Sequence, residues 1–588
     1  MKNLFYLNKY FYKYRIRLGL GIVFVTLSNY FGVLIPQQIR TALDFVQGEI
    51  QTYKIGGEEL QSELGQKLLL FAGVVIGFSI MKGIFMYFMR QTIIVMSRLI
   101  EYDLRKEIFG HMEMMDLAYF KRNKTGDFMS RISEDVSKVR MYVGPATLYG
   151  INLVTLFTLT IYAMFKVSVT LTLYTLIPLP ILSLSIYYVS SKINFRSTLI
   201  QKQLSVLTSV AQEVYSGIRV IKSYVKEDQF ASHFEKESEE FKSKSLDLAK
   251  INALFFPVMI LLISASTVIV IYAGGIEVAK GNITTGNIAE FIIYVNMLTW
   301  PVTSIGWIAS LIQQAEASQA RINELLTEKS ELNRSGEVTD ALKGDIEFRN
   351  VSFVYPDTGI KAINQVSFHL KAGEKMAIIG KTASGKSTIA DLILRMYDVT
   401  TGEILLDNKN IKEHDLDNVR RKIGYVPQDV FLFSDSVTNN IGFGKGEIDQ
   451  LEAERYAEYA AIHDEISGLP KGYDTMMGER GVTLSGGQKQ RISIARAFVK
   501  DPDIVILDDC LSAVDTDTEQ KIMKYLNEAL ENKTSIIITH RIHNLLSFDK
   551  ILVLENGGIS EMGTHDELIE KGGYYKEMLE QQNIGEEV

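Results

Sequence analysis

The sequence predicts two unlike parts: an all-α transmembrane domain of six helices with long cytoplasmic helical extensions, fused to an α/β domain. Three observations predict this fold class. Long apolar stretches without charges crowd the first half of the chain and do not recur in the second. Polar segments with few turn residues separate these stretches. From Asp345 onward, short β-branched runs alternate with helical patterns, which is typical of a soluble α/β domain.

Composition is consistent with this division and excludes several classes. The 588 residues are too many for one hydrophobic core. The mean hydropathy is +0.07 although 22% of the residues are charged, which indicates a mixture of a very apolar and an ordinary part. With 62 Lys and Arg against 70 Asp and Glu, the net charge of −8 argues against a nucleic-acid partner. Cys510 is the single cysteine, which excludes an internal disulfide framework.

The apolar stretches predict membrane helices, because a bilayer core needs about 20 apolar residues per helix. The predicted spans cover residues 18–39, 68–89, 142–165, 167–191, 251–276 and 291–315. They define a transmembrane domain at residues 1–320, followed by a linker at 321–344. Buried helices of a large soluble domain seldom run so long without a charge.

Lys and Arg set the orientation by the positive-inside rule. The N-terminus and the basic segments 90–140 and 192–250 are expected in the cytoplasm, and the acidic loop 40–67 outside. The two inner segments are expected to be helical extensions that turn near 123–128 and 214–218. Lys82 is the one charge deep in a predicted span, and contact with a ligand and snorkelling to the inner face fit it equally.

A phosphate-loop motif opens the chemistry of the domain at residues 345–588. The strand Lys375–Ile379 runs into a G-x-x-x-x-G-K-[ST] match, and a helical run begins at Thr388. The motif comprises Gly380, Lys381, Thr382, Ala383, Ser384, Gly385, Lys386 and Ser387. Its backbone N–H groups and the helix N-terminus suit a phosphate chain, with Lys386 on the β- and γ-phosphates and Ser387 on Mg²⁺. This predicts a phosphate-loop nucleotide-binding domain.

A second apolar strand, Asp503–Leu507, ends in Asp508 and Asp509. A carboxylate at the C-terminal end of a strand beside a phosphate loop can hold Mg²⁺. Such strands are common in α/β domains, so the signal is specific only in combination with the phosphate loop.

Leu484-Ser-Gly-Gly-Gln488 lies between these two motifs. With Tyr355, Gln428, Asp515 and His540 in the expected order, the second half resembles the nucleotide-binding domain of ATP-binding cassette (ABC) proteins. The first half resembles the exporters of that family at residues 120–131 and 217–222. The resemblance covers nearly the whole chain and implies an ATPase coupled to transport in the cell membrane.

The resemblance also implies roles for individual residues. Tyr355 would stack on adenine, Gln428 would reach Mg²⁺ and the attacking water, and His540 would contact the γ-phosphate. Ser485, Gly486, Gly487 and Gln488 would serve ATP held by another subunit, and Asp515 would link the two sites. Because the chain has one such domain, it is expected to be a half-transporter that dimerises. Its expected cargo is a hydrophobic or amphipathic drug or lipid.

The sequence departs from the family pattern at the residue after Asp508. Competent members carry Glu there as the general base, and this chain has Asp509, with about 1.5 Å less reach. This favours a heterodimer in which the chain's own site is degenerate. A homodimer with two slow sites, and a mainly regulatory ATP-binding subunit, remain alternatives. Ala383 stands where glycine is more usual, which is expected to be a mild change.

Overall fold

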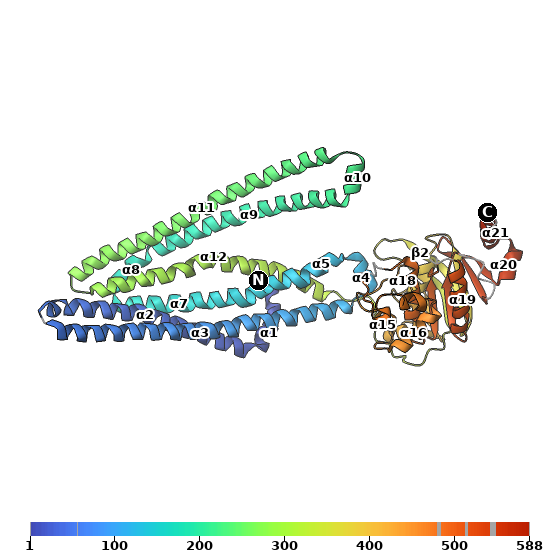
Figure 1. Ribbon diagram of the computed structural model, residues 1–588, viewed down its shortest axis with the longest axis horizontal. Coiled ribbons are helices and arrows are strands. Elements are labelled where there is room, and N and C mark those ends of the chain that lie inside the picture. The colour runs from blue at the N-terminus through green and yellow to red at the C-terminus, as the bar shows by residue number, and fades with distance from the viewer. Residues whose placement is uncertain (1, 56, 479–483, 512–515, 541–547, 587–588) are drawn as a thin grey trace. The chain divides into compact units, whose positions relative to one another are not determined.

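The protein is described by a computed structural model that covers residues 2–586 except 56, 479–483, 512–515 and 541–547. The chain divides into two compact units. The first unit, Met1–Glu113 with Gly126–Glu328, is helical, and the second, Met114–Thr125 with Lys329–Val588, contains the sheets. Figure 1 shows the long helices of the first unit in blue to green and the α/β elements of the second in yellow to red.

The helical unit is built mainly from long helices. Its elements are a 3₁₀ helix at Asn3–Leu7, α1 (Asn8–Lys13), α2 (Arg15–Ile55), α3 (Gly57–Glu113), α5 (Thr125–Ser130), α6 (Val136–Met141), α7 (Thr147–Val167), α8 (Val169–Leu176), α9 (Pro178–Ser216), α10 (Ile218–Ser223), α11 (Glu227–Ala279) and α12 (Thr285–Thr327). π-helical turns at Arg131–Asp135 and Tyr142–Ala146 join α5, α6 and α7. In Figure 1, α9 and α11 form a long antiparallel hairpin closed by α10.

Within the described residues, five helices are long and apolar enough to cross a membrane. They lie at Arg15–Glu49, Gly65–Glu113, Thr125–Val167, Glu227–Ala279 and Thr285–Thr327. The fourth predicted span, 167–191, is not one continuous helix, because it is divided between α8 and α9. Ser168 caps α8 by accepting from the Leu171 N–H, and Pro178 begins α9, where its missing N–H is tolerated.

Residues 40–67 do not form the outer loop that the sequence predicts. α2 continues to Ile55 and α3 begins at Gly57, so the segment is helical on both sides of residue 56. The charges that marked the segment as a loop do not oppose a helix. Glu, Gln, Lys and Leu are good helix formers, and the segment holds no proline.

A buried ion pair joins α2 and α12 at their outer ends. Glu290 of α12 has 0% of its side chain exposed, and its Oε2 lies 3.2 Å from Nη1 of Arg40 on α2. The Tyr294 hydroxyl donates to Oε1 of Glu290 (2.8 Å). Beside this pair, the Gly286 N–H donates to Asp44 (2.9 Å), and a β-carbon on Gly286 would come within 2.7 Å of the Arg40 carbonyl oxygen. The two helices therefore approach closely through polar contacts, which the hydropathy pattern of the sequence does not reveal.

The second unit holds two sheets within its described residues. The four-stranded sheet has the order β2 (Lys361–Leu370), β1 (Ile346–Val354), β4 (Thr401–Leu406) and β5 (Lys409–Asn410). The six-stranded sheet has the order β10 (Gly558–Gly563), β9 (Lys550–Glu555), β3 (Lys375–Gly380), β8 (Thr534–Ile538), β7 (Ile504–Asp508) and β6 (Ile423–Val426). From β9 to β6 the strands are parallel, so their carboxyl ends share one edge.

The helices that follow the phosphate loop are α13 (Lys386–Ile393), α14 (Leu416–Lys422), α15 (Val437–Gly442), α16 (Gln450–Tyr459), α17 (His463–Ser467), α18 (Gly486–Phe498), α19 (Thr516–Ala529), α20 (His565–Lys571) and α21 (Tyr574–Glu586). Helices α13, α14, α18 and α20 contact the six-stranded sheet. Alternate residues of β3 enter two separate cores: Ala377 and Ile379 join one, Met376 and Ile378 the other. This is the period of two expected for a strand buried on both faces.

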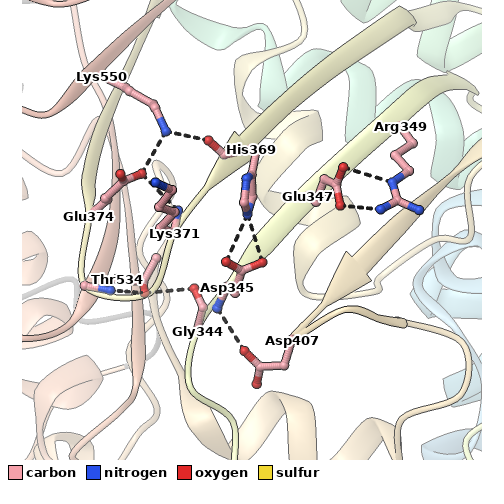
Figure 2. A network of polar contacts seen from close by, with 11 residues as sticks. Gly344, Asp345, Glu347, Arg349, His369, Lys371, Glu374, Asp407, Thr534 and Lys550 are labelled. Carbon is pink, nitrogen blue, oxygen red and sulfur yellow. Dashed lines mark hydrogen bonds and ion pairs between the residues drawn. The ribbon is translucent and has the colours of Figure 1, made fainter.

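A polar network connects the two sheets (Figure 2). Lys550 of β9 donates to the His369 carbonyl oxygen of β2 (2.7 Å) and to Glu374 (2.8 Å). The Thr534 hydroxyl donates to the Gly344 carbonyl oxygen and accepts from the Gly373 N–H. These contacts fix the start of β3, and with it the strand that leads into the phosphate loop.

The short helix α4 (Leu117–Arg122) belongs to the second unit. Asp116 caps it by accepting from the Tyr119 N–H (2.8 Å), and Ala118 is buried in the core that also holds Phe353. The Lys121 ammonium lies 4.9 Å from the centre of the Tyr355 ring. A segment that follows the end of α3 therefore packs as part of the α/β fold.

Candidate nucleotide site

A cleft of about 520 Å³ opens at the carboxyl ends of β3, β7 and β8. It brings together most of the site residues that the sequence predicts. Its lining includes Tyr355, Thr382, Ala383, Ser384, Gly385, Lys386, Ser387, Thr388, Gln428, Asp508, Asp509 and His540. Gly380 and Lys381 stand at the entrance to the same loop.

The phosphate loop folds around the Lys386 ammonium. Nζ of Lys386 donates to the carbonyl oxygens of Gly380 (2.9 Å) and Lys381 (2.8 Å). Burial lowers the pKa of Lys386, and Asp508 and Asp509 oppose that shift. Gly385 has a φ of +101°, and a β-carbon there would lie 2.5 Å from the Ala362 carbonyl oxygen, so only glycine fits. The loop thus presents a positive charge and close backbone, as polyphosphate binding requires.

Ala383 adopts a left-handed backbone with a φ of +63°. An L-residue in this region costs about 1–2 kcal/mol, and glycine would avoid that cost. The Ala383 side chain is exposed, so the cost is one of backbone conformation and not of packing.

Asp508 and Ser387 form the oxygen pair expected for Mg²⁺. Asp508 ends β7 and is almost fully buried. Burial raises the pKa of Asp508, and a hydrogen bond from Ser387 and the charge of Lys386 partly offset that rise. Mg²⁺ is usually held by one or two protein oxygens together with substrate phosphates and water, so this donor set beside the phosphate loop fits the ion.

Gln428, Asp509 and His540 surround the place where a γ-phosphate and a water molecule would meet. The Gln428 amide donates to Oδ2 of Asp509 (3.3 Å). Burial lowers the pKa of His540, and the charge of Lys386 lowers it further, which favours the neutral imidazole. A carboxylate, an amide and a neutral imidazole at the edge of a phosphate site can position a water molecule and accept its proton.

Tyr355 forms one wall of the cleft. Its hydroxyl and the Thr388 hydroxyl are 2.9 Å apart, and its ring meets Phe353 and Tyr397 edge-on at 4.9 and 5.5 Å. These contacts hold an aromatic face beside the first turn of α13, where a flat base can stack.

The residues of the Leu484–Gln488 motif do not line this cleft within the described chain. Ser485 caps α18 by accepting from the Gln488 N–H, and the Gln488 side-chain oxygen accepts from the Ser485 N–H (2.9 Å). The Gln488 amide also donates to Glu465 (2.8 Å). Gly486 and Gly487 form the first turn of this helix, whose N-terminus favours an anion. Asp515 lies outside the described residues.

Two parts of the cleft were missed by sequence reasoning. Ile360, Lys361 and Ala362 come from the start of β2, and Asn556 and Gly557 from the β9–β10 hairpin. The Asn-Gly pair is a strong hairpin signal and could have predicted the turn. Its place beside the phosphate loop follows from strand order, which the local sequence does not encode.

The carboxyl group of Asp391 on α13 has a raised pKa, which makes the stability of the protein depend on pH. Burial raises the pKa of Asp391 to about 6, with Lys121 opposing and Asp508 adding to the shift. A carboxyl with a raised folded-state pKa binds its proton more tightly when folded, so its contribution to stability is lost as pH rises from about 4 to about 6.

We therefore expect Asp391→Asn to raise the melting temperature at pH 8 and to flatten the pH dependence of stability between pH 4 and 6. Thermal unfolding of the detergent-solubilised protein across this pH range measures it, with the exposed Asp357→Asn as the control. Equal pH profiles for Asp391→Asn and the unmodified protein would contradict the assignment.

Comparisons with known proteins agree with this geometry. Residues 18–302 match the family model described as "ABC transporter transmembrane region", and residues 363–512 match the one described as "ABC transporter". A solved structure described as a bacterial Atm1-family ABC exporter with ATP bound has a similar fold. Its TM-score is 0.77 at 24% identity, over 97% of this chain and 98% of that one.

Curated relatives match over nearly the whole chain. A probable multidrug resistance ABC transporter ATP-binding/permease protein of Bacillus subtilis (strain 168) is 35% identical over 98% of this chain and 97% of its own length. A multidrug resistance-like ATP-binding protein of Escherichia coli (strain K12) is 33% identical over 95% and 94%. An ATP-dependent lipid A-core flippase of Shigella flexneri is 32% identical over 87% and 88%.

Proposed function

Because this chain belongs to the ABC transporter family, we propose that it is one half of a dimeric exporter of hydrophobic or amphipathic molecules, drugs or lipids. Members of the family couple ATP hydrolysis to transport, and the chain combines a multi-span membrane domain with a cytoplasmic ATPase domain that uses ATP and Mg²⁺. The multidrug and lipid A-core names of its relatives support the cargo class.

The observation that carries the dimer is the composition of the cleft. The phosphate loop, Asp508, Asp509 and His540 share one cleft, and the signature residues Ser485 to Gln488 stand elsewhere on the same unit. A complete site therefore needs the signature of a second subunit. ATP bound between two such surfaces would draw the ATPase domains together, and the membrane helices would follow as the closed state is favoured.

The tip of the α9–α11 hairpin also has features that favour contact with a second subunit. Tyr215, Val220, Tyr224 and Val225 around α10 are largely exposed, although they are apolar or aromatic. Val225 has a φ of +52°, which is an outlier for a β-branched residue. Exposed apolar groups on a strained turn at the end of a long cytoplasmic hairpin are suited to contact with a second subunit.

In the proposed reaction, Asp509 accepts a proton from a water molecule that Gln428 orients, as that water attacks the γ-phosphorus of ATP. The bond from the γ-phosphorus to the β–γ bridging oxygen breaks, and ADP and inorganic phosphate are released. Lys386 and the loop N–H groups neutralise charge on the β- and γ-phosphates, and His540 donates a hydrogen bond to the γ-phosphate from its neutral ring. Ser387 and Asp508 would hold Mg²⁺, which supplies charge neutralisation at the phosphate oxygens.

We further propose that the dimer is a heterodimer and that this chain's own site turns over slowly. Aspartate at position 509 has about 1.5 Å less reach than glutamate, and loss of reach at a general base costs about 10²-fold in rate. The signature of this chain would then complete the partner's site. A homodimer with two slow sites stays the alternative, because Gln428 and His540 stand in the same cleft as Asp509.

ATP turnover of the chain, expressed and purified alone, tests this choice. The heterodimer predicts turnover no higher than that of Lys386→Ala, in a sample that is folded and largely monomeric by light scattering. Turnover well above the Lys386→Ala background, in a dimeric sample, would contradict the heterodimer and leave the homodimer.

A further inference from the structure

An ammonium group lies inside the second membrane-spanning helix. Lys82 is the only charged residue between Leu68 and Met89. It lies on the face of α3 that packs on α2, because Phe31 of α2 stacks near both Phe78 and Phe85, at 5.9 and 5.7 Å between ring centres. Phe78, Lys82 and Phe85 recur at helical spacing, so Lys82 faces the neighbouring helix and is only partly exposed.

The side chain points away from the cytoplasm. The Ser28 hydroxyl donates to the Lys82 carbonyl oxygen (3.2 Å), which places the two backbones at one level. A β-carbon built on Gly32 would lie 3.4 Å from Nζ of Lys82, so the ammonium reaches the level of Gly32. Gly32 is one turn beyond Ser28, about 6 Å farther along α2 toward its outer end. Side chains lean toward the N-terminus of their helix, which for α3 is the outer end.

Because the Lys82 side chain points outward, it does not snorkel to the inner face of the membrane in this conformation. α3 ends at Glu113 and leads into residues of the ATPase unit, so its Arg90 end is the cytoplasmic one. Arg90 lies eight residues from Lys82, about 12 Å along the helix, and the outward reach adds about 6 Å. The ammonium thus lies near the middle of a hydrocarbon core about 30 Å thick.

The charge has no partner within the part of the chain that the structure describes. No hydrogen bond or ion pair of the Lys82 ammonium is present among these residues. A further polar side chain of α2 faces α7: the Asn29 amide donates to the Thr155 hydroxyl (2.7 Å) and to the Asn152 carbonyl oxygen (3.4 Å). Asn29 is one turn from Gly32. An unpaired charge at this depth is costly and marks a functional position by default.

We propose that Lys82 binds the anionic headgroup, a phosphate or sulfate, of an amphipathic cargo. The inference rests on the proposed exporter function and narrows its cargo class. The ammonium supplies the positive charge that a phosphate needs inside the bilayer. The rings of Phe31 on α2 and of Phe78 and Phe85 on α3 lie on the same helix–helix interface as the lysine. The end of the lysine stem lies against Gly32, where a β-carbon would be in ordinary van der Waals contact with Cδ, Cε and Nζ of Lys82.

The test uses the assembled transporter, with its partner subunit if it needs one, in phosphatidylcholine vesicles. ATP turnover is measured against increasing dioleoyl phosphatidic acid in the bilayer, and separately against dodecyl phosphate added from solution. Dodecylphosphocholine and dodecyltrimethylammonium are the zwitterionic and cationic comparisons. The two anionic probes distinguish a lipid headgroup from a free amphiphile as the source of the phosphate.

We expect Lys82→Gln to raise the half-stimulating concentration of an anionic probe about tenfold or more, because a hydrogen bond to a charged group is lost. Lys82→Arg should restore most of the response, and responses to the other probes should not change. Arg90→Gln, on the same helix at the membrane boundary, is the matched control and should respond like the unmodified protein.

Three results would overturn the inference. Equal responses of Lys82→Gln and the unmodified protein to the anionic probes would remove Lys82 from cargo binding while the exporter function stands. Loss of subunit assembly in Lys82→Gln would assign the ammonium to a carboxylate of the partner instead. Stimulation by none of the four amphiphiles would overturn the proposed amphipathic cargo class and this inference with it.

Discussion

Replacing Asp509 by glutamate is expected to raise ATP turnover at this chain's own site by up to about 10²-fold. The added methylene returns about 1.5 Å of reach to the carboxylate, and a general base must lie within hydrogen-bond distance of the water it deprotonates. Gln428 already contacts the carboxylate, at 3.3 Å, so the longer side chain has a partner in place. Single-turnover and steady-state ATP hydrolysis of the assembled transporter measure the change.

Asp509→Asn separates the catalytic role from a structural one. It keeps the shape of the side chain and removes the base, so a catalytic Asp509 predicts a loss of about 10²- to 10⁴-fold at this site. Lys386→Ala gives the background of the same site. If Asp509→Asn leaves the turnover of the assembled pair nearly unchanged, Asp509 is not a working base, and the chain acts mainly as an ATP-binding subunit.

The backbone at Asp509 gives a reason for aspartate that the motif alone does not. Its φ is +47°, a left-handed conformation that Asp and Asn tolerate better than most residues. The Asp509 N–H donates to the Ile538 carbonyl oxygen (2.9 Å), which ties this turn to β8. Asp509→Glu should therefore cost some stability while it gains rate.

The sequence predicts the site well where its residues are contiguous or end a buried strand. The phosphate loop, Asp508 and Asp509 follow apolar runs, and the parallel order β3, β8, β7 brings those strand ends together. Lys361 and Asn556 reach the cleft through a hairpin and a neighbouring sheet. Their local sequence carries no phosphate signal, so only the tertiary arrangement reveals them.

The membrane part is predicted less completely, because hydropathy reports composition and not continuity. The stretch 167–191 carries no charge, but Ser168 caps the start of α8 and so separates it from α7, and Pro178 begins α9. Glu290 was outside the predicted span 291–315 by one residue, yet it is fully buried. The burial of Glu290 could not be predicted from its local sequence, because its partner Arg40 lies 250 residues away.

That ion pair predicts the second large effect. Arg40→Ala is expected to destabilise the protein by about 3–5 kcal/mol. Among the residues that the structure describes, it leaves the buried Glu290 carboxylate with the Tyr294 hydroxyl and the Asn287 amide as its remaining partners. Glu290→Gln should cost less, since a third of the Arg40 side chain is exposed and its charge can reach solvent. Chemical unfolding in mixed micelles, followed by tryptophan fluorescence, measures both.

A double-mutant cycle decides whether the charges themselves are responsible. If the cost of Arg40→Ala comes from an unpaired buried carboxylate, then Arg40→Ala combined with Glu290→Gln must be more stable than Arg40→Ala alone. Additive losses would mean instead that Arg40 acts through packing of its stem on α12. The single and double variants should differ clearly in stability, because removing one partner of a buried ion pair destabilises a protein far more than removing both. The ion pair would then be maintained as a unit that joins the outer ends of α2 and α12, with Gly286 permitting their close approach.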